Sequence, residues 1–592
     1  MLTQIIETIA VELTDDFSIP VEQVVELFEI PKELSHGHLA IPVFLLARTR
    51  KKAPPLIAKE ISEKMLTKNI PSIARIEPVG GYVNFHLKDS FLLKTLYEGV
   101  QKKGERYGYR VVGAGRSVVI DYSSPNVAKP MHVGHLRATV IGQAIRNLAE
   151  TQGYKVIGLN HLGDWGVQFG KLALAFKRWG KEYPFEAEPF ESLYKLYVRF
   201  HEEAEKDPEL EKQGSLTFKN LEEGDPELHK LWQRFVDISM KDFDRQWQRL
   251  GVRHDLVRGE SFYNDRLKSV EKQIEDKGLL VESDGAMVVD LQDEKMPPCL
   301  IRKGDGASLY ATRDIASAVY RMEELKADLN LYVVGQEQTL HFKQVFSVLR
   351  RMGFKWWDRC HHISFGMYRF KDAGKMSSRK GQIIRLEDLL NQAIEDVKKF
   401  MTERVARGAG TGSSEAPSPT SSGAAEMTVR DIDRVSEQVA IGAIVFNDLI
   451  NDRVRDVDFD WEKALSFEGD SGPYLQYVHV RCHSILRKYG LELPKEFPRE
   501  ASPLTSPSER ELVKTLLRYE EVLRHGFEQF RPNILATYLL DVSAAFNRFY
   551  HDHRIIGGEK EYELSRVILV YITREVIRGG LRVLNIQAPQ VM

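Results

Sequence analysis

Hydrophobic and polar positions follow different rhythms along the chain, and each rhythm predicts a different kind of structure. In residues 1–110, stretches with helical spacing alternate with short strand-like runs. In residues 111–406, β-branched runs such as 117–122 are followed by stretches with helical spacing, for example 134–152. From 428 to 592 the spacing is almost wholly helical. The chain is therefore expected to fold as successive parts of different architecture.

The middle part has the pattern of a parallel sheet. After the first strand, further strands are predicted at 155–160, 329–334 and 362–367, with a helix at 340–351. Repeated strand-helix-strand units favour a parallel sheet with helices on both faces, and such sheets bind ligands at the carboxyl ends of their strands. About residues 175–300 are rich in charged and aromatic residues and lack this alternation. We expect an insertion there.

Length points to a multidomain protein, and the strand-helix alternation places its middle part in the α/β class. A chain of 592 residues is too long for one hydrophobic core. We predict an α+β N-terminal domain over 1–110, a Rossmann-like parallel-sheet domain over 111–427, and an all-α C-terminal helix bundle over 428–592. Residues 407–426 are a run rich in Gly, Ala, Ser and Pro that cannot bury enough apolar surface to fold. A disordered loop or linker is expected there.

Composition excludes several classes of protein. No apolar run approaches the roughly 18–20 residues of a membrane helix, and a signal-peptide core is missing, so we expect a cytoplasmic protein. The net charge is −2, so any RNA contact must use local patches rather than a bulk basic field. The cysteines Cys299, Cys360 and Cys482 lie far apart, which argues against a disulfide framework or a cysteine-rich zinc site. Cys360 precedes His361 and His362, which could suggest a metal, but a buried thiol is the better interpretation.

The segment after the first strand carries the most chemistry. It reads SSPNVAKPMHVGHLR and leads into the predicted 134–152 helix. A helix N-terminus offers unpaired N–H groups and a positive dipole end, which suit a phosphate, and glycine lets a ligand approach the backbone. Two histidines there could donate hydrogen bonds to charge developing on phosphorus. The candidate residues of this segment are Asn126, Lys129, His132, Gly134 and His135.

Other interpretations of this segment are weaker but stay open from the residues alone. A zinc-protease helix spaces its histidines four apart with a glutamate between them, and neither feature is present. A phosphate loop of the Walker type would need a glycine-lysine pattern that is missing. The two histidines could also be unrelated surface residues.

Two short strings together give a specific resemblance. PMHVGHLR resembles the HIGH signature of class I aminoacyl-tRNA synthetases, with Val133 in place of isoleucine, and GKMSSRKG at 374–381 resembles the KMSKS signature. They occur in the family's order, each after a predicted strand. The resemblance implies that ATP binds with Mg²⁺ on its phosphates and that His132 and His135 act on the phosphate. It also implies a mobile loop that draws in the leaving pyrophosphate, formed by Lys375, Met376, Ser377 and Ser378.

One position departs from the family pattern. Ser378 stands where KMSKS has its second lysine, and Arg379 and Lys380 are displaced downstream. We hypothesise that Lys129, just before the histidine pair, supplies the missing positive charge.

Longer strings resemble the arginyl enzymes of this class. They are DYSSPNVAKPMHVGHLRATVIG, NHLGDWGVQFG, SLYATRDIASAVYR and VVGQEQTLHF. A guanidinium is a planar cation with five donors, which calls for carboxylates and an aromatic hydroxyl or ring. The resemblance implies that Asp314 and Tyr310 hold the guanidinium, and a solvated helix face is the alternative for these two. It further implies a second carboxylate at Glu260, contacts to the α-amino end from Asn126 and Gln338, and a place for His341 on the ATP side.

The two ends of the chain also resemble this family. GGYVNFHL resembles the N-terminal strand of arginyl enzymes that contacts the tRNA elbow, which implies roles for Tyr82 and Asn84; plain strand pairing is the alternative. The helical end resembles their anticodon-binding domain, with Tyr477, Tyr550 and Met592 as candidate contacts. Core packing is the alternative for the tyrosines. A tryptophan of some relatives is Arg554 here, so the sequence departs from the family pattern at this position.

The resemblance implies a monomeric ligase that uses ATP to form arginyl-adenylate. The arginyl group would then pass to the 2′-hydroxyl of the terminal adenosine of tRNA(Arg). We expect bound tRNA to be needed for activation, and we expect no zinc, no other tightly bound cofactor and no membrane partner. Two alternatives remain at this stage. A cysteinyl enzyme would carry zinc-binding cysteines, and an inactive relative that only binds tRNA would not need the histidine pair and Lys375.

Overall fold

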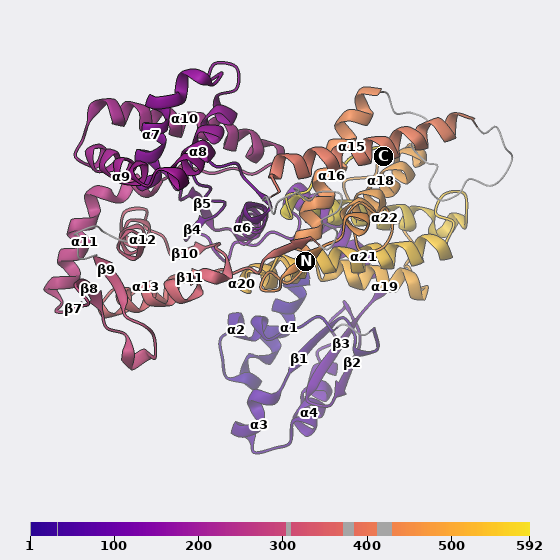
Figure 1. The fold of residues 1–592 in the computed structure, drawn as a ribbon. Coiled ribbons are helices and arrows are strands. Elements are labelled where there is room, and N and C mark those ends of the chain that lie inside the picture. The colour runs from indigo at the N-terminus through magenta and orange to yellow at the C-terminus, as the bar shows by residue number, and fades with distance from the viewer. Residues whose placement is uncertain (1, 32–33, 303–309, 371–383, 411–428) are drawn as a thin grey trace.

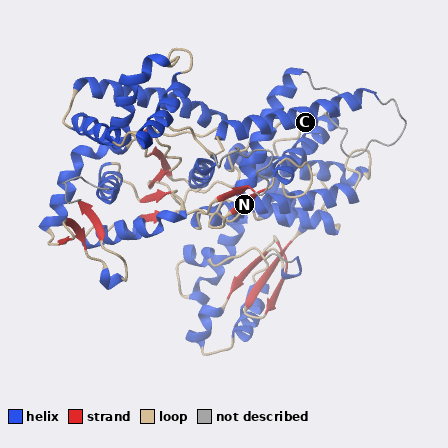
Figure 2. Ribbon diagram, viewed as in Figure 1, coloured by secondary structure: helices blue, strands red, loops and turns tan. Residues whose placement is uncertain are grey.

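The computed structural model describes residues 2–31, 34–302, 310–370, 384–410 and 429–592. An N-terminal part of mixed helix and sheet lies below the rest of the molecule in Figure 1, and a helical C-terminal part lies beside the central sheet. Figure 2 shows that the strands are confined to the N-terminal and central parts, apart from one short pairing with the C-terminal part. Among the described residues, none of the helices is long and apolar enough to cross a membrane.

The N-terminal part is an antiparallel sheet with helices beside it. Its strands lie in the order β1-β3-β2, and Leu39 of β1 faces Phe85 of β3. The central strand β3 is buried along most of its length because it has a partner on each side. The elements are α1 (Leu2–Phe17), α2 (Val21–Glu26), β1 (Leu39–Pro42), α3 (Phe44–Arg50), α4 (Pro54–Leu66), β2 (Ile73–Val79), β3 (Tyr82–Leu87) and α5 (Asp89–Lys103).

The central part contains the predicted parallel sheet, with strand order β11-β10-β4-β5-β6. Val118, Val119 and Ile120 in the middle strand are fully buried, as a β-branched run covered on both faces should be. The strands are β4 (Ser117–Asp121), β5 (Lys155–Asn160), β6 (Leu256–Val257), β10 (Leu329–Tyr332) and β11 (Cys360–His362). Helices α6 (Val133–Thr151), α12 (Tyr310–Val319) and α13 (Thr339–Arg351) connect or cover them. The predicted α/β class is confirmed.

The strand predicted over 362–367 is wrong in its position. The sheet strand β11 ends at His362, and β12 (Tyr368–Phe370) instead pairs in parallel with β13 (Val457–Phe459). The backbone of Gly366 is taken by other partners: its N–H donates to the Arg453 carbonyl at 2.9 Å, and its carbonyl accepts from Arg137 at 2.7 Å. Hydrogen bonds from a distant segment therefore turn the chain away from the sheet, and nothing local in the sequence signals this.

The segment without strand-helix alternation is mostly helical. It contains α7 (Val167–Trp179), α8 (Pro189–Lys206), α9 (Glu209–Glu222), α10 (Pro226–Arg249) and α11 (Asn264–Asp276). A small antiparallel sheet follows, made of β7 (Leu280–Ser283), β8 (Ala286–Val289) and β9 (Cys299–Arg302).

The C-terminal part is a helix bundle, as predicted. Its helices are α16 (Val429–Leu449), α17 (Trp461–Ala464), α18 (Gly472–Tyr489), α19 (Pro507–Leu517), α20 (Tyr519–Glu528), α21 (Asn533–Asp552) and α22 (Lys560–Val583). The preceding helix α15 (Leu386–Gly410) packs on α16 and continues into the run expected to be disordered. That prediction is therefore wrong for residues 407–410, because a packed helix extends easily by one hydrogen bond per residue. Residues 411–426 lie outside the described residues.

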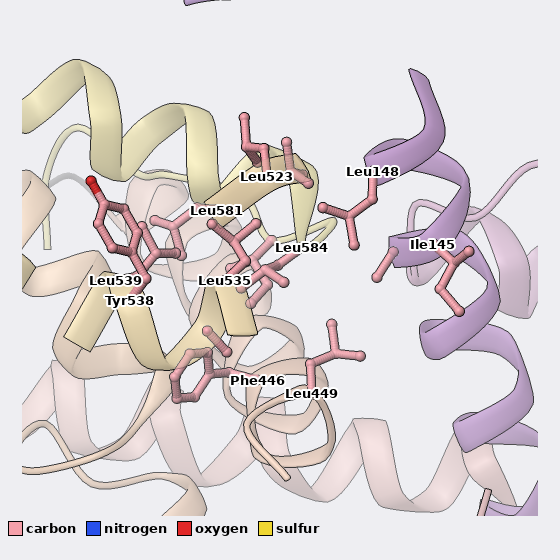
Figure 3. Packing of buried hydrophobic residues seen from close by; sticks show 14 of the residues in the cluster. Ile145, Leu148, Phe446, Leu449, Leu523, Leu535, Tyr538, Leu539, Leu581 and Leu584 are labelled. Carbon is pink, nitrogen blue, oxygen red and sulfur yellow. The ribbon is translucent and has the colours of Figure 1, made fainter. Parts of the chain in front are cut away.

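Helix α6 joins the sheet to the bundle. In Figure 3, Leu148 of α6 points toward leucines of α20, α21 and α22 across the joint. Leu148 is fully buried, and the side-chain amide of Asn147 donates to the Val583 carbonyl at 3.0 Å. A Cβ on Gly526 would lie 3.2 Å from Leu148, so the contact is tight. The helix that begins at the histidine pair is thus held on both sides by apolar packing.

Candidate active site

A cavity of about 970 Å³ opens at the carboxyl ends of β4 and β10. This is the edge where parallel sheets bind ligands. One wall is the loop after β4 with the start of α6, and the other is α12 with the segment between β10 and α13. It brings together most of the predicted site residues, namely Asn126, His132, Gly134, His135, Glu260, Asp314, Gln338 and His341.

The histidine pair caps the N-terminus of α6. The N–H of His132 donates to Nδ1 of His135 at 3.1 Å, and the N–H of Gly134 donates to Nδ1 of His132 at 3.0 Å. Each Nδ1 is thus an acceptor, so a neutral ring carries its proton on Nε2. Burial, together with the charge of Lys129, lowers the pKa of His132; burial followed by the charges of His132 and Lys129 lowers the pKa of His135 to about 3. Both rings are therefore neutral Nε2–H donors near pH 7.

Glycine is needed at position 134 for a reason the sequence did not show. A Cβ there would lie 2.8 Å from Cε1 of the His132 ring. Such a contact is closer than van der Waals packing allows, so any larger residue would push the ring out of its capping position. Gly134 therefore makes room for the histidine as well as for a ligand.

The loop between β4 and α6 is held in an unusual backbone conformation. Ser123, Ser124 and Ala128 have φ angles of +75°, +36° and +64°, a region that residues with a Cβ rarely adopt. Helix α10 supports the loop: Trp247 donates to the Ser123 hydroxyl at 2.8 Å, and the Ser239 hydroxyl accepts from the Ala128 N–H at 3.0 Å. Helix α10 thus acts on the site by fixing this loop.

The opposite wall is acidic. Nε2 of His341 lies 2.6 Å from Oδ2 of Asp314. Burial would raise the pKa of Asp314, but the hydrogen bond and charge of His341 outweigh it and hold this pKa below its usual value. Burial raises the pKa of Glu260 to about 7; Arg313 opposes the shift, and Asp164 and Asp314 add to it. These carboxylates form a pocket suited to a cation.

Asn126 lies at the junction of the two walls. Its backbone pairs with Gly163 as a parallel bridge, and the Val127 N–H donates to the Gly163 carbonyl at 3.1 Å. A Cβ on Gly163 would lie 2.1 Å from the side-chain oxygen of Asn126. The glycine of the NHLGDWG string therefore gives the Asn126 side chain its place.

Part of the predicted site lies outside the described residues. This applies to the side chain of Tyr310 and to the second signature, with Lys375, Met376, Ser377, Ser378, Arg379 and Lys380. The chain is described again from Ile384, whose carbonyl accepts from the Val133 N–H at 3.2 Å, and the Leu386 N–H donates to the Met131 carbonyl at 2.9 Å. The described chain that follows the second signature is thus paired with the backbone of the first signature.

Lys129 lies beside the histidine pair but turns toward α8. Its Nζ is 5.1 Å from the centre of the Tyr197 ring on α8. A lysine over an aromatic face is held by a cation–π interaction that is weak enough to be exchanged. Its charge acts on both His132 and His135, since it lowers their pKa values.

In the N-terminal part, Tyr82 and Asn84 have different environments. Tyr82 is half-buried, and the Phe44 ring, 51% exposed, lies edge-on at 5.4 Å from it. The side chain of Asn84 is buried at 3% exposure, so it reaches a partner only if the strand or its cover moves. Gly81 allows the aromatic pair, because a Cβ there would lie 2.4 Å from the Phe44 ring.

In the helix bundle, two of the predicted residues meet around a third that the sequence reasoning missed. The guanidinium of Arg481 lies 4.7 Å from the Tyr477 ring centre and 5.1 Å from that of Tyr550, and it donates to the Tyr477 hydroxyl at 2.8 Å. Tyr550 is 39% exposed. Met592 is buried at 6% exposure within the core, so its side chain offers no surface for stacking.

The sequence reasoning also missed His161, Asp164 and Arg313. His161 and Arg313 line the cavity, and Asp164 accepts from the Ser261 N–H and hydroxyl at 2.8 Å and 2.6 Å. The sequence did carry a signal for His161 and Asp164, because the NHLGDWG string places both just after β5. Among the described residues, no group of three or more His, Cys, Asp or Glu side chains could hold a metal ion.

The parallel sheet, the histidine pair at the start of α6 and the cavity between them define the catalytic domain of a class I aminoacyl-tRNA synthetase. Residues 100–461 match the family described as tRNA synthetases class I (R), catalytic domain. Residues 3–87 match the arginyl tRNA synthetase N terminal domain, and residues 475–592 match the DALR anticodon binding domain. The chain belongs to the arginyl-tRNA synthetase family.

Individual relatives agree with this assignment. The chain is 42% identical to an arginine–tRNA ligase of Clostridium botulinum strain Langeland over 99% of both chains. It is 41% identical to arginine–tRNA ligase 2 of Bacillus anthracis over 100% of this chain and 99% of that one. The solved arginyl-tRNA synthetases of Thermus thermophilus and Plasmodium falciparum share the fold, with TM-scores of 0.80 and 0.75 at 23% and 24% identity. Each covers 100% of this chain, with 100% and 99% of their own chains aligned.

Proposed function

We propose that this protein attaches L-arginine to tRNA(Arg) in two steps. In the first, an oxygen of the arginine carboxylate attacks the α-phosphorus of ATP, whose bond to the β-phosphate oxygen breaks and releases pyrophosphate with its Mg²⁺. In the second, the 2′-hydroxyl of the terminal adenosine attacks the arginyl carbonyl and releases AMP. The observation that carries the proposal is that one cavity holds an acidic pocket beside a pair of histidine donors at a helix N-terminus.

The acidic wall would bind the substrate cation. Asp314 and Glu260 supply carboxylates for the guanidinium, with Tyr310 defining its plane, because a charge-assisted hydrogen bond is about twice as strong as a neutral one. Asn126 and Gln338 hold the α-amino end. His341, which already contacts Asp314 at 2.6 Å, orients that carboxylate and faces the ATP side.

The other wall would stabilise the transition state of activation. Negative charge grows on the phosphorus, and the Nε2–H groups of His132 and His135, together with the N-terminus of α6, are fixed donors that need no reorganisation. Lys375 on the second-signature segment would bind the leaving pyrophosphate. Lys129 would exchange its contact with Tyr197 for a phosphate oxygen and so replace the lysine missing at Ser378.

Both ends of the chain would bind tRNA. Tyr82 with the exposed Phe44 forms an aromatic surface for a base of the tRNA elbow, and Arg48 and Lys51 nearby are exposed cations for its phosphates. Tyr477 and Tyr550 around Arg481 form a stacking surface for the anticodon. We infer that the enzyme acts as a cytoplasmic monomer and needs bound tRNA before it activates arginine.

The test is an aminoacylation assay of the purified protein with each of the twenty amino acids and total tRNA. Charging with arginine alone, dependent on ATP, supports the proposal. Charging with another amino acid, or tRNA binding without any charging, overturns it. Arginine-dependent pyrophosphate exchange with and without tRNA(Arg) tests the tRNA requirement, and substantial exchange without tRNA contradicts it.

A further inference from the structure

A buried ion pair, one member of which lines the cavity, joins the two walls. Nη2 of Arg321 donates to Oδ2 of Asp121 at 2.8 Å, and the two side chains are 0% and 7% exposed. Asp121 is the last residue of β4, just before the loop that leads to the histidine pair. Arg321 lies in the π-helical segment Tyr320–Glu324 that continues α12, the helix that carries Asp314. The pair therefore connects the arginine-binding helix to the strand that positions the phosphate-binding loop.

The two partners are satisfied to different degrees. The Asp121 carboxylate also accepts from the Ser124 hydroxyl at 2.9 Å, so both of its oxygens have a donor. Within the described residues, Nε and Nη1 of Arg321 make no hydrogen bond of normal geometry; the guanidinium interacts with the Tyr263 hydroxyl and packs 4.8 Å from the centre of the Tyr332 ring. Burying a guanidinium with so few partners opposes folding rather than favouring it. Stability alone does not account for this arginine.

The pair lies within electrostatic reach of the substrate site. Asp121 and Tyr332 line the same cavity as Asp314 and Glu260. Burial raises the pKa of Asp314, whereas His341, then the charge of His161, and then the charge of Arg321 lower it. The positive charge of Arg321 attracts the Asp314 carboxylate, and for the same reason it repels a substrate cation bound to that carboxylate. An arginine there is tolerable for cation binding only while a carboxylate neutralises it.

We propose that Asp121 is a positioning and specificity residue whose charge neutralises Arg321, so that the Asp121–Arg321 pair fixes α12 against β4 without repelling the substrate guanidinium. The inference rests on the proposed function, since it takes arginine as the bound cation. The pair acts through its charges and not through contact with the substrate, so removing either charge should change the binding of a cation in opposite directions, which a loss of packing alone would not do.

The experiment compares a cation with its neutral counterpart. L-Citrulline has the shape of arginine with an uncharged urea group, and it is used as a competitive inhibitor of aminoacylation at saturating tRNA(Arg) and ATP. Asp121→Asn keeps the shape of the side chain but leaves Arg321 uncompensated. We expect it to raise KM for arginine about tenfold relative to the inhibition constant of citrulline, which corresponds to about 1.4 kcal/mol. Arg321→Met leaves the carboxylate uncompensated, and we expect the same ratio to fall.

A matched control separates charge from stability. Glu509 and Arg566 in the helix bundle form another buried pair at 2.9 Å with 2% and 6% exposure, so Glu509→Gln also removes a buried carboxylate charge. It is expected to lower the thermal unfolding temperature without changing the arginine-to-citrulline ratio. The inference is overturned if Asp121→Asn weakens the binding of arginine and of citrulline equally. It is also overturned if the ratio of KM for arginine to the inhibition constant of citrulline changes in the same direction in Asp121→Asn and Arg321→Met. If Asp121→Asn does not fold, the sign found with Arg321→Met decides. Loss of arginine charging by the unmodified protein would instead refute the proposed function.

Discussion

Asp314→Asn is the most direct test of the acidic pocket. The Asp314 side chain is only 20% exposed and lies 2.6 Å from the His341 ring. Asparagine has the same shape and its side-chain oxygen can still accept from Nε2 of His341, so the fold should be kept. What is lost is a charge-assisted bond to the substrate guanidinium, worth about 1.5–3 kcal/mol in a site of this kind. KM for arginine should therefore rise by about 10- to 150-fold.

The assay is steady-state aminoacylation at saturating tRNA(Arg), with arginine and ATP varied in turn. KM for ATP should stay within about twofold, because the proposed role gives Asp314 a contact with the amino acid and none with the phosphates. Asp293→Asn is the matched control: Asp293 is 69% exposed, pairs with Arg351 outside the cavity and should leave both constants unchanged. Equal increases in the two KM values would refute the assigned role, since they would indicate a general disturbance of the domain.

Three further predictions concern other parts of the molecule. Burial raises the pKa of Glu260 to about 7, so its carboxyl must lose a proton before it can bind the substrate cation. KM for arginine should therefore rise about tenfold when the pH falls from 7.5 to 6. Glu260→Gln should bind arginine more weakly at every pH, and its KM should not change over this pH range. A flat profile in the unmodified enzyme would contradict this assignment. Lys129→Ala should lower tRNA-dependent pyrophosphate exchange at least tenfold, and near-normal exchange would end the idea that it replaces the missing lysine. Asp448 is fully buried and lies 3.0 Å from Arg137, so Asp448→Asn leaves the buried Arg137 without its ionic partner and should lower the thermal unfolding temperature by several degrees. Asp433 lies on the same helix but is 57% exposed, so Asp433→Asn should leave this temperature unchanged.

Much of the fold was predictable because its signals are local. The run SVVIDY is apolar on both faces and became the central strand, and the helical spacing after it became α6 within a residue at each end. The exception shows the limit. The segment 362–367 has the residues of a strand, but Arg137 and the chain near Arg453 take its hydrogen bonds and turn it out of the sheet. A pairing with a partner about ninety residues away cannot be seen in a window of ten.

The residues of the cavity were easier to predict from the sequence than the residues that meet in the helix bundle. His132 and His135 were found because a short string carries both, and Asp314 and Gln338 because longer strings resemble one family. Arg481 was missed because its meaning depends on Tyr477 and Tyr550 being on either side of it, and the two tyrosines are far apart in sequence.

By itself the sequence determined which elements form and which chemical groups are available, since backbone propensity, apolar spacing and residue identity are properties of short segments. Only the tertiary structure decided how those groups work. It placed Asn84 and Met592 in the interior, raised the pKa of Glu260 by burial, and set Arg321 beside Asp121. The reason is that burial and electrostatic energy depend on distance through space, and the distances that matter here join residues from β4, α12 and the inserted helices.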